Sequence, residues 1–145
     1  MGGLIFTGLT LGRDARAKEV ANSFAFAERH RSLWSEAVNR HELHRIVAEH
    51  ADLSAEPITP AEEIFLNMVI VHHELGWRMA KSMNKNLKPL KMDVAKFYSL
   101  PLPRAVWEKT KNSRNQKFAI FVEKAIKSSR SKPHFLRHLL TVLIS

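Results

Sequence analysis

The chain has 145 residues and no cysteine, and 45% of its residues are hydrophobic and 26% are charged. This length fits a single hydrophobic core, and the composition excludes a disordered, collagen-like or multi-span membrane chain. The lack of cysteine excludes a disulfide framework, a catalytic thiol and thiolate metal sites, and it favours a reducing cytoplasm.

The net charge of +9 is unevenly distributed along the chain. Residues 1–77 hold 7 Lys and Arg against 11 Asp and Glu, a net charge of −4, whereas residues 78–145 hold 16 against 3, a net charge of +13. A strongly basic half predicts an anionic partner such as nucleic acid, anionic lipid or an acidic protein surface. The alternative is that the lysines only solvate exposed helix faces.

Residues 1–12 form an apolar segment that is interrupted by glycines and followed at once by cations. A spanning helix needs about 20 apolar residues, so the segment is too short to cross a bilayer, and its cations do not precede it as they do in a signal peptide. We expect a partial membrane anchor over 1–12 and a single helical domain over 13–145; the alternatives for 1–12 are a frayed terminus or a strip packed on the core. The residues expected to contact a membrane are Leu4, Ile5, Phe6, Leu9, Arg13 and Arg16.

Helical periodicity predicts a first helix over residues 14–39, with Asp14 as its N-cap. A second, shorter helix is predicted over 41–51, followed by a polar connection over 52–57. The apolar stripe of the first helix consists of residues mostly three or four apart, namely Val20, Phe24, Ala27, Trp34 and Val38.

The clearest helix start is the sequence Thr59-Pro60-Ala61-Glu62. Thr59 and Glu62 have the spacing of a capping box, and Pro60 stands at the first helical position, where its missing N–H costs nothing. The predicted helix covers about 59–83, and residues 64–71 are apolar almost all round, so it should be the buried central helix.

Later elements are predicted over 93–100, from Pro103 onward, and over 118–128, with a polar break at 112–115 and a last apolar segment over 135–144. No alternating strand pattern of useful length is present. The predicted fold is all-α, an irregular bundle of about five to six helices around the central helix.

Among the eight histidines, His134 and His138 are four residues apart and could share one metal ion, but no carboxylate lies nearby in sequence to complete a site. No cofactor motif is present, so neither a metal nor a cofactor is expected. Arg45 and His50 have the Arg-x4-His spacing of helical ribonucleases of the HEPN class, which the segment resembles. That resemblance implies that His50 acts as acid or base and that Arg45 holds a phosphate. Those enzymes usually have a polar residue after the arginine, where this chain has Ile46.

A polar stretch near residues 109–117 carries several cations among amide and hydroxyl side chains. Such a stretch is able to contact phosphates, and its alternative is a solvated loop. The candidate residues for binding an anionic partner are Lys109, Lys111, Arg114 and Lys117.

Segments 9–16, 30–36, 52–53, 58–63 and 99–107 together resemble small bacterial proteins of unassigned activity. In those proteins one N-terminal membrane helix leads directly into a cytoplasmic helical domain. The resemblance implies an architecture and proximity to a membrane rather than a reaction. This chain departs from the pattern because it lacks a full-length spanning helix.

The leading functional hypothesis is a non-catalytic helical interaction module, cytoplasmic and peripheral to the inner membrane of a bacterium. The second hypothesis is a nucleic-acid-binding protein that uses the basic C-terminal half, and the third is a HEPN-like ribonuclease. The expected partner is an anionic surface, either membrane lipid or nucleic acid, or another protein, and no small-molecule substrate is identified. An enzyme is less favoured than a binding module.

Overall fold

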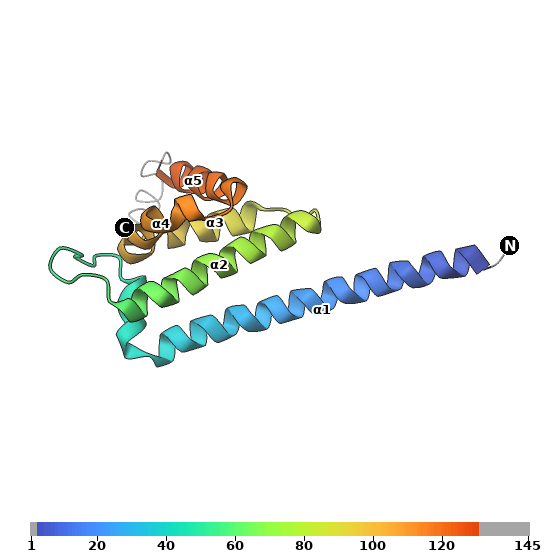
Figure 1. Ribbon diagram of the computed structural model, residues 1–145, viewed down its shortest axis with the longest axis horizontal. Coiled ribbons are helices and arrows are strands. Elements are labelled where there is room, and N and C mark those ends of the chain that lie inside the picture. The colour runs from blue at the N-terminus through green and yellow to red at the C-terminus, as the bar shows by residue number, and fades with distance from the viewer. Residues whose placement is uncertain (1–2, 131–145) are drawn as a thin grey trace, which may run out of the picture. The chain divides into compact units, whose positions relative to one another are not determined.

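The computed structural model describes residues 3–130, and every regular element in this range is a helix (Figure 1). The predicted all-α fold is therefore confirmed for the described part of the chain. The apolar segment predicted over 135–144 lies outside it. With η marking 3-10 helices, the elements are α1 (Gly3–Asn39), η1 (His41–Val47), α2 (Pro60–Ser82), α3 (Lys88–Phe97), α4 (Pro101–Thr110), η2 (Lys111–Ser113) and α5 (Gln116–Arg130).

The chain divides into two compact units, residues 1–41 and residues 42–145. The first unit contains α1, and the second contains η1 from Glu42 onward, α2 to α5 and η2. The boundary expected after residue 12 falls inside α1, which is continuous across Gly12.

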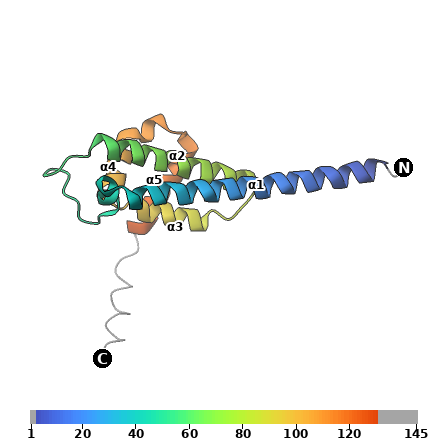
Figure 2. The same cartoon turned by 90° about the horizontal axis from the view of Figure 1, so that it is seen from below.

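Helix α1 has 37 residues, and its ribbon is continuous in Figure 2. The predicted start at Asp14 is wrong, because the helix begins at Gly3 and Asp14 lies in its interior. The leucines and alanines on both sides of Asp14 are good helix formers, and they allow the helix to extend N-terminally despite a cost of about 1 kcal/mol for each interior glycine. The backbone of the predicted membrane segment is therefore helical from Gly3 onward.

Element η1 replaces the α-helix predicted over residues 41–51 and ends earlier, at Val47. Leu43 and Ile46 are fully buried, and their spacing of three matches the three residues per turn of a 3-10 helix. In the loop that follows, the carboxylate of Asp52 accepts hydrogen bonds from the Ser54 hydroxyl at 2.6 Å and the Ser54 amide at 2.9 Å. These bonds lower the pKa of Asp52 and hold the turn.

Helix α2 begins with the predicted capping box. The Glu62 amide donates to the Thr59 hydroxyl at 3.3 Å, and the Thr59 amide donates to the Glu62 carboxylate at 2.8 Å. At the other end Asn84 adopts a left-handed conformation with φ of 50°. The Asn84 amide donates to the carbonyl of Lys81 and the Lys85 amide to that of Ala80, which is a Schellman termination.

Most of the circumference of α2 is buried, as expected of the central helix. The fully buried apolar side chains include Phe65, Leu66 and Ile70. One face remains exposed and carries an apolar stripe of Ile64, Met68, Val71 and Leu75. The helix therefore supplies both the centre of the core and one apolar surface.

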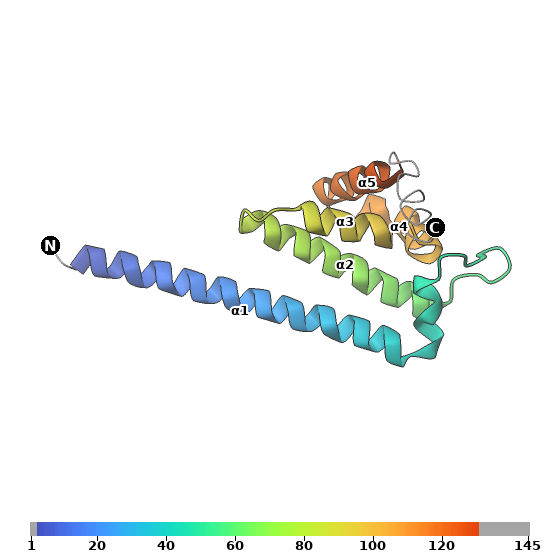
Figure 3. The same cartoon turned by 180° about the vertical axis from the view of Figure 1, so that it is seen from behind.

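Helices α3, α4 and α5 complete the second unit (Figure 3). Helix α3 packs between α2 and α5, most extensively on α5, and α4 packs on α2. Helix α3 starts at Lys88 rather than at the predicted residue 93, and α4 starts at Pro101 rather than at the predicted Pro103. Both helices have a proline in their first turn, where a proline is well tolerated. The aromatic rings of Tyr98, Trp107 and Phe118 join the three helices, with centroid distances of 5.2 and 5.9 Å.

Arg45 in η1 is bound to the N-terminal end of α2. Its Nε and one terminal nitrogen each donate to the Glu62 carboxylate at 2.9 Å. The same guanidinium donates to the carbonyls of Glu56 at 2.7 Å and Pro57 at 2.8 Å, and it is 3.0 Å from the Glu56 carboxylate. Five oxygens thus face its five N–H donors. The Glu62 side chain is only 2% exposed, and its pKa is lowered chiefly by the hydrogen bonds from Arg45.

Replacing Leu66 with Ala should lower the free energy of unfolding by about 2–5 kcal/mol, because the side chain is fully buried and leaves a cavity. Ile64→Ala is the matched control: Ile64 stands two residues away on the same helix but is 64% exposed, so its replacement should change stability by no more than about 0.5 kcal/mol. Denaturant unfolding measures both values. Equal losses would contradict the assigned faces of α2.

Replacing Glu62 with Gln should destabilise the protein by about 3 kcal/mol at neutral pH, because it removes the buried carboxylate that accepts two hydrogen bonds from the Arg45 guanidinium and leaves only the exposed Glu56 carboxylate beside it. The pKa of Glu62 is lower in the folded state, so its contribution is present above the unfolded value of about 4.3 and is lost as the pH falls through the folded value. The wild type and variant should therefore converge in stability in acid. Glu63→Gln is the control, and a difference between wild type and Glu62→Gln that does not vary with pH would contradict the prediction.

Candidate anion-binding site

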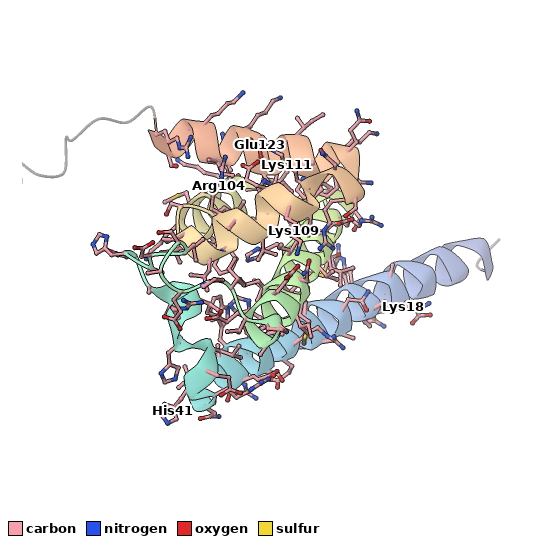
Figure 4. All side chains as sticks on the ribbon, turned by 60° about the vertical axis from the view of Figure 1, so that its left-hand side comes forward. Lys18, His41, Arg104, Lys109, Lys111 and Glu123 are labelled. Carbon is pink, nitrogen blue, oxygen red and sulfur yellow. The ribbon has the colours of Figure 1, made fainter. Side chains whose placement is uncertain are left out.

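An ion-pair network joins α4, η2 and α5. The Glu108 carboxylate contacts Arg104 and Lys111, each at 2.5 Å, and the Lys111 ammonium is 3.6 Å from Glu123. The indole N–H of Trp107 donates to Glu123 at 2.8 Å. Figure 4 shows Lys111 and Glu123 close together, with Arg104 nearby. The hydrogen bond between Lys111 and Glu108 lowers the pKa of the Glu108 carboxyl group and raises the pKa of the Lys111 ammonium group, so both side chains stay charged.

Two other predicted cations contact α2. The Lys109 ammonium is 2.5 Å from the Glu63 carboxylate, and the Arg114 guanidinium donates to the Asn67 side-chain carbonyl at 2.5 Å. Lys109, Lys111 and Arg114 were predicted to bind an external anion, and the structure gives each of them an internal partner. Their charges and donors are therefore at least partly engaged inside the second unit.

Lys117 differs from the other three predicted residues. It is exposed and forms no ion pair within the described residues. Lys124 and Lys127 have the same properties and follow it on α5 at offsets of seven and ten residues. Residues that are seven apart lie on the same side of a helix, separated by about two turns. Residues that are ten apart are separated by nearly three turns and lie on an adjoining part of that side. Together with Ile120, which is 49% exposed, they form what we call the α5 lysine face: Lys117, Ile120, Lys124 and Lys127.

A shallow hollow of about 360 Å³ borders the α5 lysine face where η2 meets α5. Lysines 111, 124 and 127 contribute cations to its lining, and Asn112 and Gln116 contribute amides. Ala119 and Ile120 make part of the lining apolar, and Glu123 contributes a carboxylate beside Lys111. The hollow therefore presents the cations of Lys124 and Lys127 beside an apolar patch.

Local capping sets the orientation of α5. The Asn115 side-chain carbonyl accepts from the amides of Lys117 at 3.0 Å and Phe118 at 3.2 Å, which begins the helix. Phe118, Val122 and Ala125 are buried, so the opposite side of α5 must face solvent. Sequence reasoning included Lys117 but missed Lys124 and Lys127. Their helical spacing to Lys117 was the signal that could have found them.

Arg45 and His50 do not form a catalytic pair in the structure. The five donors of Arg45 already face Glu62, Glu56 and Pro57, and no hydrogen bond joins Arg45 to His50, which is exposed in a turn. A phosphate would have to displace these partners to reach the guanidinium.

The described histidines are not gathered around a common point. His72 and His73 are both buried in α2, and His73 Nδ1 is 3.3 Å from the Tyr98 hydroxyl. Within residues 3–130, no three His, Asp or Glu side chains are placed to hold a metal ion. His134 and His138 lie outside the described residues.

Comparison with family models, curated proteins and solved structures finds no match to this chain. Among the described residues, none of the helices combines the length and apolar character needed to span a membrane.

Replacing Glu108 with Gln should increase the rate at which acetic anhydride acetylates Lys111. Only a neutral amine reacts, and Glu108 keeps Lys111 protonated by raising its pKa. Mass spectrometry would measure acetylation of Lys111 relative to Lys124, which forms no ion pair in the structure and serves as the internal control. An unchanged ratio would contradict the role assigned to Glu108.

Proposed function

We propose that this protein is a non-catalytic helical module that binds an anionic membrane surface. The observation that carries the proposal is the α5 lysine face, where three exposed cations without internal ion pairs share one side of a helix. Lys117 and Lys124 are separated by about 10 Å along the helix axis, since each residue rises by 1.5 Å. A flat anionic surface can therefore contact all three lysines at once.

The exposed Ile120 favours a membrane over other anionic surfaces. It lies between Lys117 and Lys124 on the α5 lysine face and is 49% exposed. At a bilayer the apolar side chain can enter the headgroup boundary while the lysines extend their ammonium groups to lipid phosphates. Each lysine near an anionic bilayer adds about 1 kcal/mol of attraction.

The start of α1 supports the same partner. Arg13, Arg16 and Lys18 are exposed on a helix that is continuous with the apolar segment before it, and Figure 4 labels Lys18. An apolar helical end next to cations suits interfacial binding without a span. The backbone of Leu4, Ile5, Phe6 and Leu9 belongs to this end. The resemblance to small bacterial proteins with a membrane helix and a cytoplasmic domain supports a place at the cytoplasmic face.

The environment of Arg45 supports the non-catalytic part of the proposal. Every N–H of its guanidinium has an oxygen partner inside the fold, so Arg45 serves to join η1 to the start of α2. A ribonuclease reaction would need a free guanidinium for the phosphate.

Nucleic acid is the second candidate partner, and the hollow beside α5 favours it. Lys124, Asn112 and Gln116 there offer donors for a phosphate. The aromatic side chains of α5, however, pack inward: Phe118 is buried and Phe121 contacts Trp77 at a centroid distance of 6.3 Å. This face of α5 thus provides phosphate contacts without the stacking that single-stranded nucleic acids use.

The test is binding to phosphatidylcholine vesicles with and without phosphatidylglycerol, over a salt series. The triple variant Lys117→Gln, Lys124→Gln and Lys127→Gln should weaken binding to the anionic vesicles on the order of 100-fold, since three lysines are removed. The matched control neutralises Lys88, Lys91 and Lys96 on α3, with the same change in net charge. Deleting residues 1–11 should remove the part of the binding that persists at high salt.

Equal losses in the two triple variants would show that only net charge matters and would overturn the assigned face. If the vesicles do not bind at low salt, the membrane proposal fails. Titration of the same variants with RNA and duplex DNA then tests the second candidate, whose affinity and salt slope should both fall in the α5 variant.

A further inference from the structure

The hollow beside η2 and α5 carries its available donors in two separate sets. One set consists of the amide side chains of Asn112 and Gln116, and the other consists of the ammonium groups of Lys124 and Lys127. Gln116 and Lys124 are separated by about 12 Å along the axis of α5, at about 1.5 Å per residue. The lining between the two sets is formed by Ala119, Ile120 and Glu123.

Both sets are open to a ligand. All four side chains belong to exposed residues, and none of them forms a hydrogen bond or an ion pair with any part of the chain that the structure describes. An amide side chain presents two N–H donors and an ammonium group presents three. Each set can therefore hold one phosphate group.

We propose that the hollow binds one lipid molecule that carries two phosphates, which is the chemistry of cardiolipin. The inference rests on the proposed membrane contact and names the lipid that this contact selects. One phosphate contacts Lys124 and Lys127, and the other contacts Asn112 and Gln116. Side chains on a helix tilt toward its N-terminus, so the long lysine side chains can bring their ammonium groups closer to the amides than the axial separation of the residues.

Glu123 identifies the group that lies between the two phosphates. Its Oε1 accepts the indole N–H of Trp107 at 2.8 Å and is 3.6 Å from the Lys111 ammonium. Among residues 3–130 no hydrogen bond engages its Oε2, which can therefore accept one from a ligand. A carboxylate here repels a phosphate but accepts a hydrogen bond from a hydroxyl. The glycerol bridge that joins the two phosphates of cardiolipin carries such a hydroxyl.

Ile120 favours a lipid over a nucleic acid in this hollow. It is 49% exposed and belongs both to the hollow and to the α5 lysine face. An apolar side chain beside the phosphates suits the boundary between headgroups and acyl chains, where the chains of a bound lipid begin.

The test compares two sets of phosphatidylcholine vesicles with the same number of anionic phosphates. One contains cardiolipin, and the other contains twice that molar fraction of phosphatidylglycerol. The full chain should bind the cardiolipin vesicles on the order of 10-fold more tightly, because the second phosphate adds about two hydrogen bonds. Equal affinities would overturn this inference and leave the proposed membrane contact standing, whereas binding to neither set would overturn both.

Two variants separate the hollow from the rest of the α5 lysine face. The double variant Asn112→Ala and Gln116→Ala should bring the ratio of the two affinities to about one, because it removes the second set of donors. Lys117→Gln is the matched control, since Lys117 belongs to the α5 lysine face but does not line the hollow. It should weaken binding to both sets of vesicles and keep their ratio. A double variant with the wild-type ratio, or a Lys117→Gln variant that loses the ratio while circular dichroism shows intact helices, would overturn the proposal.

A cardiolipin analogue whose glycerol bridge lacks the hydroxyl tests the position of Glu123. It should bind on the order of 5-fold more weakly than cardiolipin, the effect of one hydrogen bond. Equal affinity would overturn the assigned orientation of the lipid. Duplex DNA that displaces the chain from cardiolipin vesicles at equal phosphate concentration would show that the hollow does not select a lipid and would overturn the inference.

Discussion

The second unit depends on one buried carboxylate, that of Glu62. It accepts the Thr59 amide as part of the capping box and also receives two hydrogen bonds from Arg45. A single side chain thus fixes where α2 begins and where η1 lies against it. Since the capped helix is the central element on which α3 and α4 pack, this carboxylate positions the start of the element that the other helices pack on.

The internal ion pairs also determine which cations remain for a partner. Residues 78–145 hold three acidic side chains, Asp93, Glu108 and Glu123. Two of them belong to the network around Lys111, and Glu63 of α2 contacts Lys109. The cations near η2 are therefore largely neutralised by their surroundings, whereas those on the outer side of α5 are not. The α5 lysine face is thus one place where cations without an ion pair among the described residues remain for a partner.

The parts of this structure that could be predicted are local in sequence. The capping box needs only Thr59 and Glu62, three residues apart, and its prediction is confirmed. The partner of Arg45 lies 17 residues away, and the partner of Lys109 lies 46 residues away. Residue type and spacing cannot reveal such pairs, so Arg45 was interpreted as a phosphate ligand and Lys109 as a free cation.

The two ends of α1 show a second limit of local reasoning. Asp14 has the chemistry of an N-cap, but capping contributes only about 1 kcal/mol and does not stop a helix whose preceding residues also favour it. After the helix, residues 41–47 have an apolar spacing of three that fits either helix type. Tertiary packing of Leu43 and Ile46 decides for the 3-10 form. Boundaries are thus less predictable than the existence of the elements.

The proposed membrane contact combines two weak signals. A short apolar segment with a few cations gives only marginal, reversible attachment, and stable attachment needs two such signals. The apolar start of α1 with its cations is one signal, and the α5 lysine face is the other. Because both belong to one chain, binding of the first raises the effective concentration of the second at the same surface, so two weak contacts combine into a stronger one.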